Sequence, residues 1–157
     1  MANPTRLAAL LLVLIAIPPA AASPPAGQGK KAPDAEIQAL LDDYIRLYTA
    51  DTLDTWSGLL APGFVAAFTN DDGTTTTRTL EEFVARQRNY FATGRPISET
   101  LGNVRIDRQG RLAAVRADFT LHDGDEARKG RLMMLLIRGV DGFRVQSLIF
   151  SYHLDPA

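Results

Sequence analysis

Apolar residues near the start of the domain recur every three or four positions, which is the spacing of one buried helix stripe. The stripe consists of Ile37, Leu40, Leu41, Tyr44, Leu47 and Tyr48. It predicts a helix over residues 34–50, with Asp34 as its N-cap. A shorter helix is expected over residues 53–60, with Thr52 as its cap and Pro62-Gly63 as its end.

A third helix is predicted to begin at Thr79, because Glu82 follows three residues later and completes a capping box. Gly94 and Pro96 end this helix. Between the second and third helices, we expect a strand over 64–69, a turn over 70–73, and an edge strand or loop over 74–77. The buried stripe of the third helix is predicted to contain Leu80, Phe83, Val84, Gln87 and Phe91, with Tyr90 at its margin.

From residue 97 onward the apolar pattern repeats every second position, as in strands. Strands are expected over 97–107 and 112–122, followed by a hairpin over 130–154 that turns at Val140-Asp141-Gly142. Residues 132–137 are apolar at every position, so both faces of the sheet need a cover there. Helices on one face of an antiparallel sheet give an α+β class. The other face is predicted to form a homodimer.

The N-terminal segment has the form of a secretory signal peptide over residues 1–22. Arg6 precedes an apolar run over 7–17, and small residues follow at 20–22. The run is about half of the ~20 residues that a membrane-spanning helix needs, so no stable membrane anchor is expected after cleavage. Residues 23–33 read as a flexible linker and 34–157 as the domain. The predicted localisation is secreted or periplasmic.

Composition removes several classes of function. The formal net charge is −1, which gives no basic face for nucleic acid. The absence of cysteine excludes disulfides, thiolate catalysis and zinc–thiolate sites. His122 and His153 lie on different strands with no acidic motif beside them, so no metal site is predicted, and no cofactor is expected.

The order of elements resembles the nuclear transport factor 2-like superfamily, with the SnoaL-like branch nearest. The motifs that carry the likeness are W-x-x-L-L-x-P-x-F at 56–64, T-L-E-E-F at 79–83, A-V-R-A-D-F-T-L at 114–121 and D-G-F-R-V at 141–145. The resemblance implies a cone-shaped curved antiparallel sheet wrapped by three helices, with a pocket at the wide mouth and a dimer through the outer sheet face. Members include isomerases, cyclases, dehydratases and non-catalytic binders, so fold alone does not give function.

Candidate ligand-binding residues come from the helix stripes and the last two strands. Arg131 is the sharpest of them, either as an inward anion binder or as an outward residue at a strand end. A three-residue loop at 140–142 with a bulge at Gly142 sets it opposite Ser151, whereas a two-residue turn sets it opposite Tyr152. By alternation, Ser147 and Ser151 share a face with Phe143 and Val145. The set is Tyr44, Tyr48, Trp56, Gln87, Tyr90, Arg131, Met133, Ser147 and Ser151.

Catalytic candidates are weak, and no catalytic residue is assigned. Asp118 groups by parity with Arg116, Thr120 and His122, which favours a solvated charge pair over a general base. His153 lies near the chain end. Related sequences often carry a histidine near residue 147 or 149, and this chain does not.

Two functions follow as hypotheses. The favoured one is a domain that binds a small apolar or weakly anionic ligand in its cone, without established catalysis. The alternative is an isomerase, cyclase or dehydratase that abstracts a proton beside a carbonyl, with Asp118 or His153 as base and a tyrosine or Arg131 stabilising the enolate. A third reading, an assembly domain, requires a cone filled by side chains.

Overall fold

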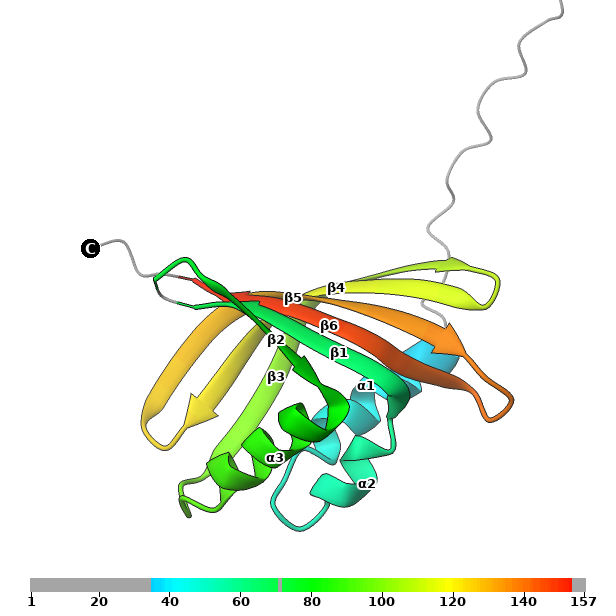
Figure 1. The fold of residues 1–157 in the computed structure, drawn as a ribbon. Helices are drawn as coiled ribbons and strands as arrows, with labels where there is room; N and C mark the ends of the chain where they lie inside the picture. The colour runs from blue at the N-terminus through cyan, green and yellow to red at the C-terminus, as the bar shows by residue number, and fades with distance from the viewer. Residues whose placement is uncertain (1–34, 71, 154–157) are drawn as a thin grey trace, which may run out of the picture. The chain divides into compact units, whose positions relative to one another are not determined.

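Three helices lie against one face of a curved six-stranded sheet (Figure 1). The computed structural model describes residues 35–70 and 72–153, and all its elements belong to the unit Lys31–Ala157. The predicted α+β class is confirmed. The elements are α1 (Ala35–Arg46), α2 (Leu53–Ser57), β1 (Leu60–Thr69), β2 (Thr75–Thr79), α3 (Leu80–Phe91), β3 (Ile97–Gln109), β4 (Leu112–Asp123), β5 (Glu126–Arg138) and β6 (Phe143–Tyr152).

The strands follow the order β2-β1-β6-β5-β4-β3. Strands β3 to β6 form the antiparallel meander that the alternation predicts. The sheet as a whole is mixed, because β1 runs parallel to β6, with α3 and the meander in the chain between them. Strand β2 pairs antiparallel with β1 at the sheet edge, so the edge-strand alternative for the threonine run is the right one.

Helix α1 ends four residues before its predicted end, at Arg46. The Thr52 hydroxyl donates to the carbonyl of Leu47 at 2.8 Å, and the Thr49 and Thr52 hydroxyls lie 2.6 Å apart. These contacts close a turn, so Tyr48 leaves the helix while remaining buried. Thr52 occupies the N-cap position of α2 as predicted, but its side chain makes no capping bond there.

Helix α2 also stops early, at Ser57, because the residues after it join the sheet. The amide of Val145 donates to the Leu59 carbonyl at 3.0 Å, and Leu60 pairs with Val145. Pro62-Gly63 therefore interrupts a strand instead of ending a helix. The register between β1 and β6 shifts across this dipeptide, between Leu60 and Val65.

Helix α3 begins as the sequence predicts. The Thr79 hydroxyl accepts from the Glu82 amide at 3.4 Å, and the Glu82 carboxylate accepts from the Thr79 amide at 2.9 Å. Both halves of the capping box are present. The predicted residues Phe83, Val84 and Gln87 are buried, whereas Leu80, Tyr90 and Phe91 are half-buried.

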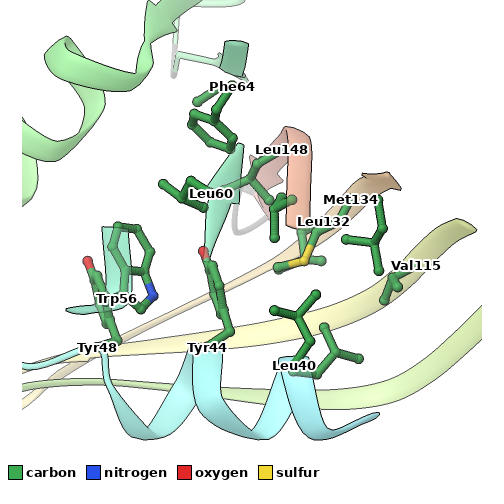
Figure 2. Packing of buried hydrophobic residues seen from close by; sticks show 14 of the residues in the cluster. Leu40, Tyr44, Tyr48, Trp56, Leu60, Phe64, Val115, Leu132, Met134 and Leu148 are labelled. Atoms are coloured by element: carbon green, nitrogen blue, oxygen red, sulfur yellow. The ribbon is translucent and has the colours of Figure 1, made fainter. Parts of the chain in front are cut away.

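The core lies between the helices and the inner face of the sheet (Figure 2). Figure 2 shows Tyr44 on α1, and Tyr48 just after this helix, beside Trp56, while Leu132, Met134 and Val115 come from the sheet. The alternation predicted for β4 is confirmed, because all five of its predicted inward residues are buried: Ala113, Val115, Ala117, Phe119 and Leu121.

In the closing hairpin, Arg131 pairs with Ser151, as the three-residue loop with a bulge at Gly142 would predict, but the bulge lies elsewhere. Next to the turn, Arg138 pairs with Phe143, and Gln146 is the extra residue on β6. The bulge at Gln146 shifts the alternation of β6, so Leu148, Phe150 and Tyr152 continue the inner face. The prediction that Ser147 and Ser151 share a face with Val145 is therefore wrong.

The predicted signal peptide (1–22), the linker (23–33) and the N-cap Asp34 lie outside the described residues. In the part of the chain that the structure describes, no helix combines the length and apolarity needed to cross a membrane.

Candidate functional site

A cavity of about 390 Å³ lies between the helices and the inner face of the sheet. This size is in the range of sites for small organic molecules. The cone is therefore not filled by side chains, which argues against a pure assembly domain. Its lining consists of Tyr44, Tyr48, Trp56, Phe68, Thr69, Asn70, Phe83, Arg86, Gln87, Tyr90, Glu99, Phe119, Leu121, Asp123, Glu126, Arg128, Leu132, Leu148, Phe150 and Tyr152.

One wall of the cavity is an aromatic group from the helices, Tyr44, Tyr48, Trp56 and Phe83, called here the helix-side cluster. The Trp56 ring lies 5.3 Å from both tyrosine rings. The Tyr48 hydroxyl donates to the Gln87 side-chain carbonyl at 2.6 Å. Burial raises the pKa of the Tyr44 and Tyr48 phenols, so both remain protonated and able to donate.

A second wall, called the sheet-side cluster, consists of Phe68, Phe119, Phe150 and Tyr152. Phe68 and Phe150 stack at 5.1 Å between parallel strands, and Phe119 meets the Phe150 and Tyr152 rings edge to face. Gly130 lies beneath the Phe119 ring, and a Cβ at that position would come within 2.5 Å of it. The two clusters give the cavity two aromatic walls, a lining that is compatible with flat or apolar groups.

Glu99 places a carboxyl group in this largely aromatic cavity. It lies on β3 opposite Leu121, on the inner face. Burial raises the pKa of Glu99 to about 7, and its charge contributes to the raised pKa values of Tyr44 and Tyr48. A carboxyl group with this pKa can hold or release a proton near neutral pH, which general acid–base chemistry requires.

A second carboxylate in the lining, Asp123, is already neutralised. The Tyr90 hydroxyl donates to its Oδ2 at 2.7 Å, and Arg95 Nε lies 2.8 Å from its Oδ1, an ion pair without hydrogen-bond geometry. Arg95 also donates to the Asp123 carbonyl at 2.7 Å and lies 3.9 Å from Glu126. This network ties the end of α3 to the turn after β4.

Two cations, Arg86 on α3 and Arg128 on β5, complete the lining at exposed positions. The Arg128 guanidinium lies over the Tyr152 ring, 3.9 Å from its centre. Within residues 35–70 and 72–153, neither guanidinium has an ion-pair partner. Both charges are available to a bound anion.

The structure brings five of the nine predicted ligand-binding residues together in the cavity lining: Tyr44, Tyr48, Trp56, Gln87 and Tyr90. The other four, Arg131, Met133, Ser147 and Ser151, lie on the outer face of β5 and β6. Their placement in the cone is wrong, because side chains on β5 alternate about the inward Leu132 and Met134, and the bulge in β6 turns the two serines outward.

The catalytic candidates also lie outside the cavity. Arg131 lies 3.3 Å from Asp118 on the neighbouring strand, and Asn103 donates to the same carboxylate at 2.6 Å. The Asn103 hydrogen bond and the Arg131 charge lower the Asp118 pKa. The charge-pair interpretation of Asp118 therefore fits. His153 is exposed, so neither it nor Asp118 is a base for the cavity.

Sequence reasoning missed Glu99, although the pattern contained a signal. The partly buried residues of β3 are odd-numbered before Asn103 (Ile97, Glu99 and Leu101) and even-numbered after it (among them Val104 and Ile106). The change occurs at Asn103, which has a φ of 51° and forms a bulge in the pairing with β4. A Gly-Asn dipeptide at the point where the apolar residues change from odd to even positions predicts such a bulge. With the bulge there, Glu99 lies on the same face as Ile97 and Leu101.

Among residues 35–70 and 72–153, no group of three or more His, Asp or Glu side chains is arranged to hold a metal ion. The arrangement in the cavity instead offers phenol donors, the buried carboxyl group of Glu99 and two cations. These groups can bind an organic molecule or move a proton on it.

Known structures with this fold match most of the domain. A protein from Novosphingobium aromaticivorans, provisionally described as an aromatic ring hydroxylase, has a TM-score of 0.62 at 18% identity, covering 77% of this chain and 89% of its own. A protein of the nuclear transport factor 2-like family from Streptomyces avermitilis, provisionally described as a dehydratase, has a TM-score of 0.63 at 16% identity over 77% and 96%. A protein of unknown function from Pseudomonas putida has a TM-score of 0.65 at 15% identity over 77% and 87%.

These identities establish the fold alone. A search of curated protein sequences finds no match. The model of the SnoaL-like domain matches residues 37–155, which is most of the chain. The six-stranded curved sheet and the helices on its inner face agree with this match, and the chain therefore belongs to the SnoaL-like domain family.

Proposed function

We propose that this domain binds one small apolar or weakly anionic molecule in its cavity. The observation that carries the proposal is an aromatic-lined cavity of about 390 Å³ with phenol groups in its helix-side cluster. The affinity comes from apolar surface of the ligand and of the cavity wall that is removed from water. The side chains of Tyr44, Tyr48 and Gln87 orient the polar atoms of the ligand.

The test is calorimetric titration with the neutral aromatic probe 2-naphthamide. The wild-type protein should bind it, and Leu148→Phe should weaken binding by about ten-fold because the larger ring occupies cavity space. Ile149→Phe is the matched control, since it adds a ring to the outer face of the same strand and should leave binding unchanged. No binding by folded wild-type protein, or equal effects of the two variants, would contradict the proposal.

A second candidate function, proton transfer beside a carbonyl, is favoured by Glu99. The carboxylate of Glu99 would remove the proton, and the Tyr44 phenol would donate to the developing enolate oxygen, since the Tyr48 hydroxyl already donates to Gln87. Similar structures described provisionally as dehydratases support this class of chemistry. This candidate does not use Asp118 and Arg131, which pair outside the cavity, or His153, which is exposed.

Deuterium exchange at the carbon beside the carbonyl of 2-tetralone tests this candidate by NMR. The wild-type protein should accelerate exchange, with a rate that rises through about pH 7 as Glu99 loses its proton. Glu99→Gln should abolish the acceleration, whereas Glu126→Gln, an exposed carboxylate of the same lining, should retain it. A rate equal to that in buffer would leave only the binding function.

We further propose that the protein is exported and acts as a secreted or periplasmic protein, on the strength of residues 1–22. Expression of the full chain in an export-competent bacterium should give a mature protein that begins at Ser23 and contains 157 − 22 = 135 residues. Mass spectrometry of the extracytoplasmic fraction measures this. Uncleaved chain found only in the cytoplasm would contradict it.

The partner proposed for the outer sheet face is a second copy of the chain. Met133 and Ile149 pair across β5 and β6, and with Leu135 and Ile137 they form an apolar row whose members are 41–51% exposed. The Asp118–Arg131 pair beside the row gives this face both signs of charge. A two-fold dimer needs a self-complementary surface of this kind.

A further inference from the structure

Two arginines of the cavity lining, Arg86 and Arg128, have no counter-ion among the described residues. The carboxyl groups of the same lining interact with another cation or are buried. Asp123 is paired with Arg95 at 2.8 Å, and the same guanidinium lies 3.9 Å from Glu126. Glu99 is held partly protonated near neutral pH by its burial. Neither Arg86 nor Arg128 forms an ion pair with another described residue, so each guanidinium of the lining can bind an anion.

The two arginines approach the cavity from different elements. Arg86 lies next to Gln87 on α3, and its charge acts on Tyr48. Arg128 lies over the Tyr152 ring of the sheet-side cluster, and its charge acts on Tyr90. Each cation therefore borders an aromatic group. Both guanidinium groups therefore belong to the same lining as the two aromatic clusters.

We propose that the ligand is an amphipathic monocarboxylate, an acid with a flat or apolar body that lies between the two aromatic clusters and a carboxylate that binds Arg86 and Arg128. This inference rests on the proposed binding function and adds the chemical class of the ligand. Guanidinium groups bind carboxylates by charge-assisted hydrogen bonds, which are stronger than neutral ones. Arg131, the anion binder considered from the sequence, is excluded because it pairs with Asp118 on the outer face.

A matched pair of probes, 2-naphthoate and 2-naphthamide, tests the inference by calorimetric titration. They share the ring system and differ in charge. The wild-type protein should bind naphthoate about ten-fold more tightly than naphthamide. Arg86→Gln and Arg128→Gln should each lower naphthoate affinity by about ten-fold and lower naphthamide affinity much less.

Two further variants control for loss of charge and for folding. Arg88→Gln lies on the same helix, where Arg88 pairs with the exposed Asp54, and Lys129→Gln lies beside Arg128 on β5. Neither should change the affinity of either probe. Equal affinity of the wild-type protein for both probes, or equal loss of both in the arginine variants, overturns the inference and leaves the binding function intact. Failure of both probes to bind overturns the binding function and the inference together.

Discussion

Gly130 makes room for the sheet-side cluster by having no side chain. A Cβ at this position would lie 2.5 Å from the Phe119 ring and closer still to the Ser151 carbonyl oxygen. The carbonyl belongs to the neighbouring strand and cannot move without breaking the pairing. The Phe119 ring can therefore pack in its position in the cavity wall because residue 130 has no Cβ.

Gly130→Ala should lower the free energy of unfolding by about 1–3 kcal/mol, the usual effect of an overpacked core. Gly102→Ala, in strand β3, is the control, because no atom lies within 4 Å of its Cβ position. Urea unfolding of the three proteins measures the difference. Equal stability of both variants would contradict the close packing of Phe119 on Gly130.

Glu99 should make folding stability depend on pH. Its folded-state pKa, about 7, lies above the ordinary value of 4.5, so the folded protein holds a proton that the unfolded chain releases. Stability from this group is therefore greatest below pH 4.5, falls between pH 4.5 and about 7, and is constant above that, with a loss of up to about 3 kcal/mol.

Glu99→Gln should remove this fall, because glutamine does not titrate. The measurement is the free energy of unfolding in urea at about pH 5 and about pH 8. The variant should gain stability relative to the wild-type protein at the higher pH, while the exposed control Glu126→Gln should follow the wild-type protein. A change in the free energy of unfolding between these pH values that is equal in all three proteins would refute the assignment.

At the scale of elements, the junction between β2 and α3 depends on one residue with two functions. Thr79 ends β2, pairs with Val65, and caps α3 through its hydroxyl. Helix α3 carries four residues of the cavity lining: Phe83, Arg86, Gln87 and Tyr90. The start of the helix therefore fixes the positions of these four residues.

Thr79→Ala should lower the free energy of unfolding by about 0.5–2 kcal/mol, since the Glu82 amide loses its acceptor. Thr77→Ala, an exposed position in the same strand, should change stability less. Thermal unfolding monitored by circular dichroism measures both. An equal effect of the two variants would show that the cap contributes no more than the strand.

At the scale of the whole molecule, the apolar row on the outer face is expected to be covered by a second copy. Size-exclusion chromatography with light scattering on residues 23–157 should give a dimer. Leu135→Lys should give a monomer, because a buried unpaired charge at the centre of the row costs several kcal/mol. Val140→Lys, at the 97% exposed hairpin tip, should remain dimeric. A monomeric wild-type protein would disprove the proposed dimer.

Local patterns predicted the helices, the meander, the capping box and the helix-side residues of the cavity, because these depend on neighbours within one or two turns. The parity of β4 was predictable for the same reason. Errors arose where the backbone departs from regular alternation. The bulge at Gln146 turned Ser147 and Ser151 outward, and the bulge at Asn103 separated the two parities of β3.

The sequence by itself determined the fold class, the buried stripes of α1 and α3, and the phenol and amide groups that line the cavity. The tertiary structure decided which face of each strand closes over the cavity, and so placed Glu99 and Arg128 in the lining and Arg131 and Asp118 outside it. The physical reason is that a bulge of one residue reverses every side chain beyond it, and its position is fixed by pairing with residues far along the chain.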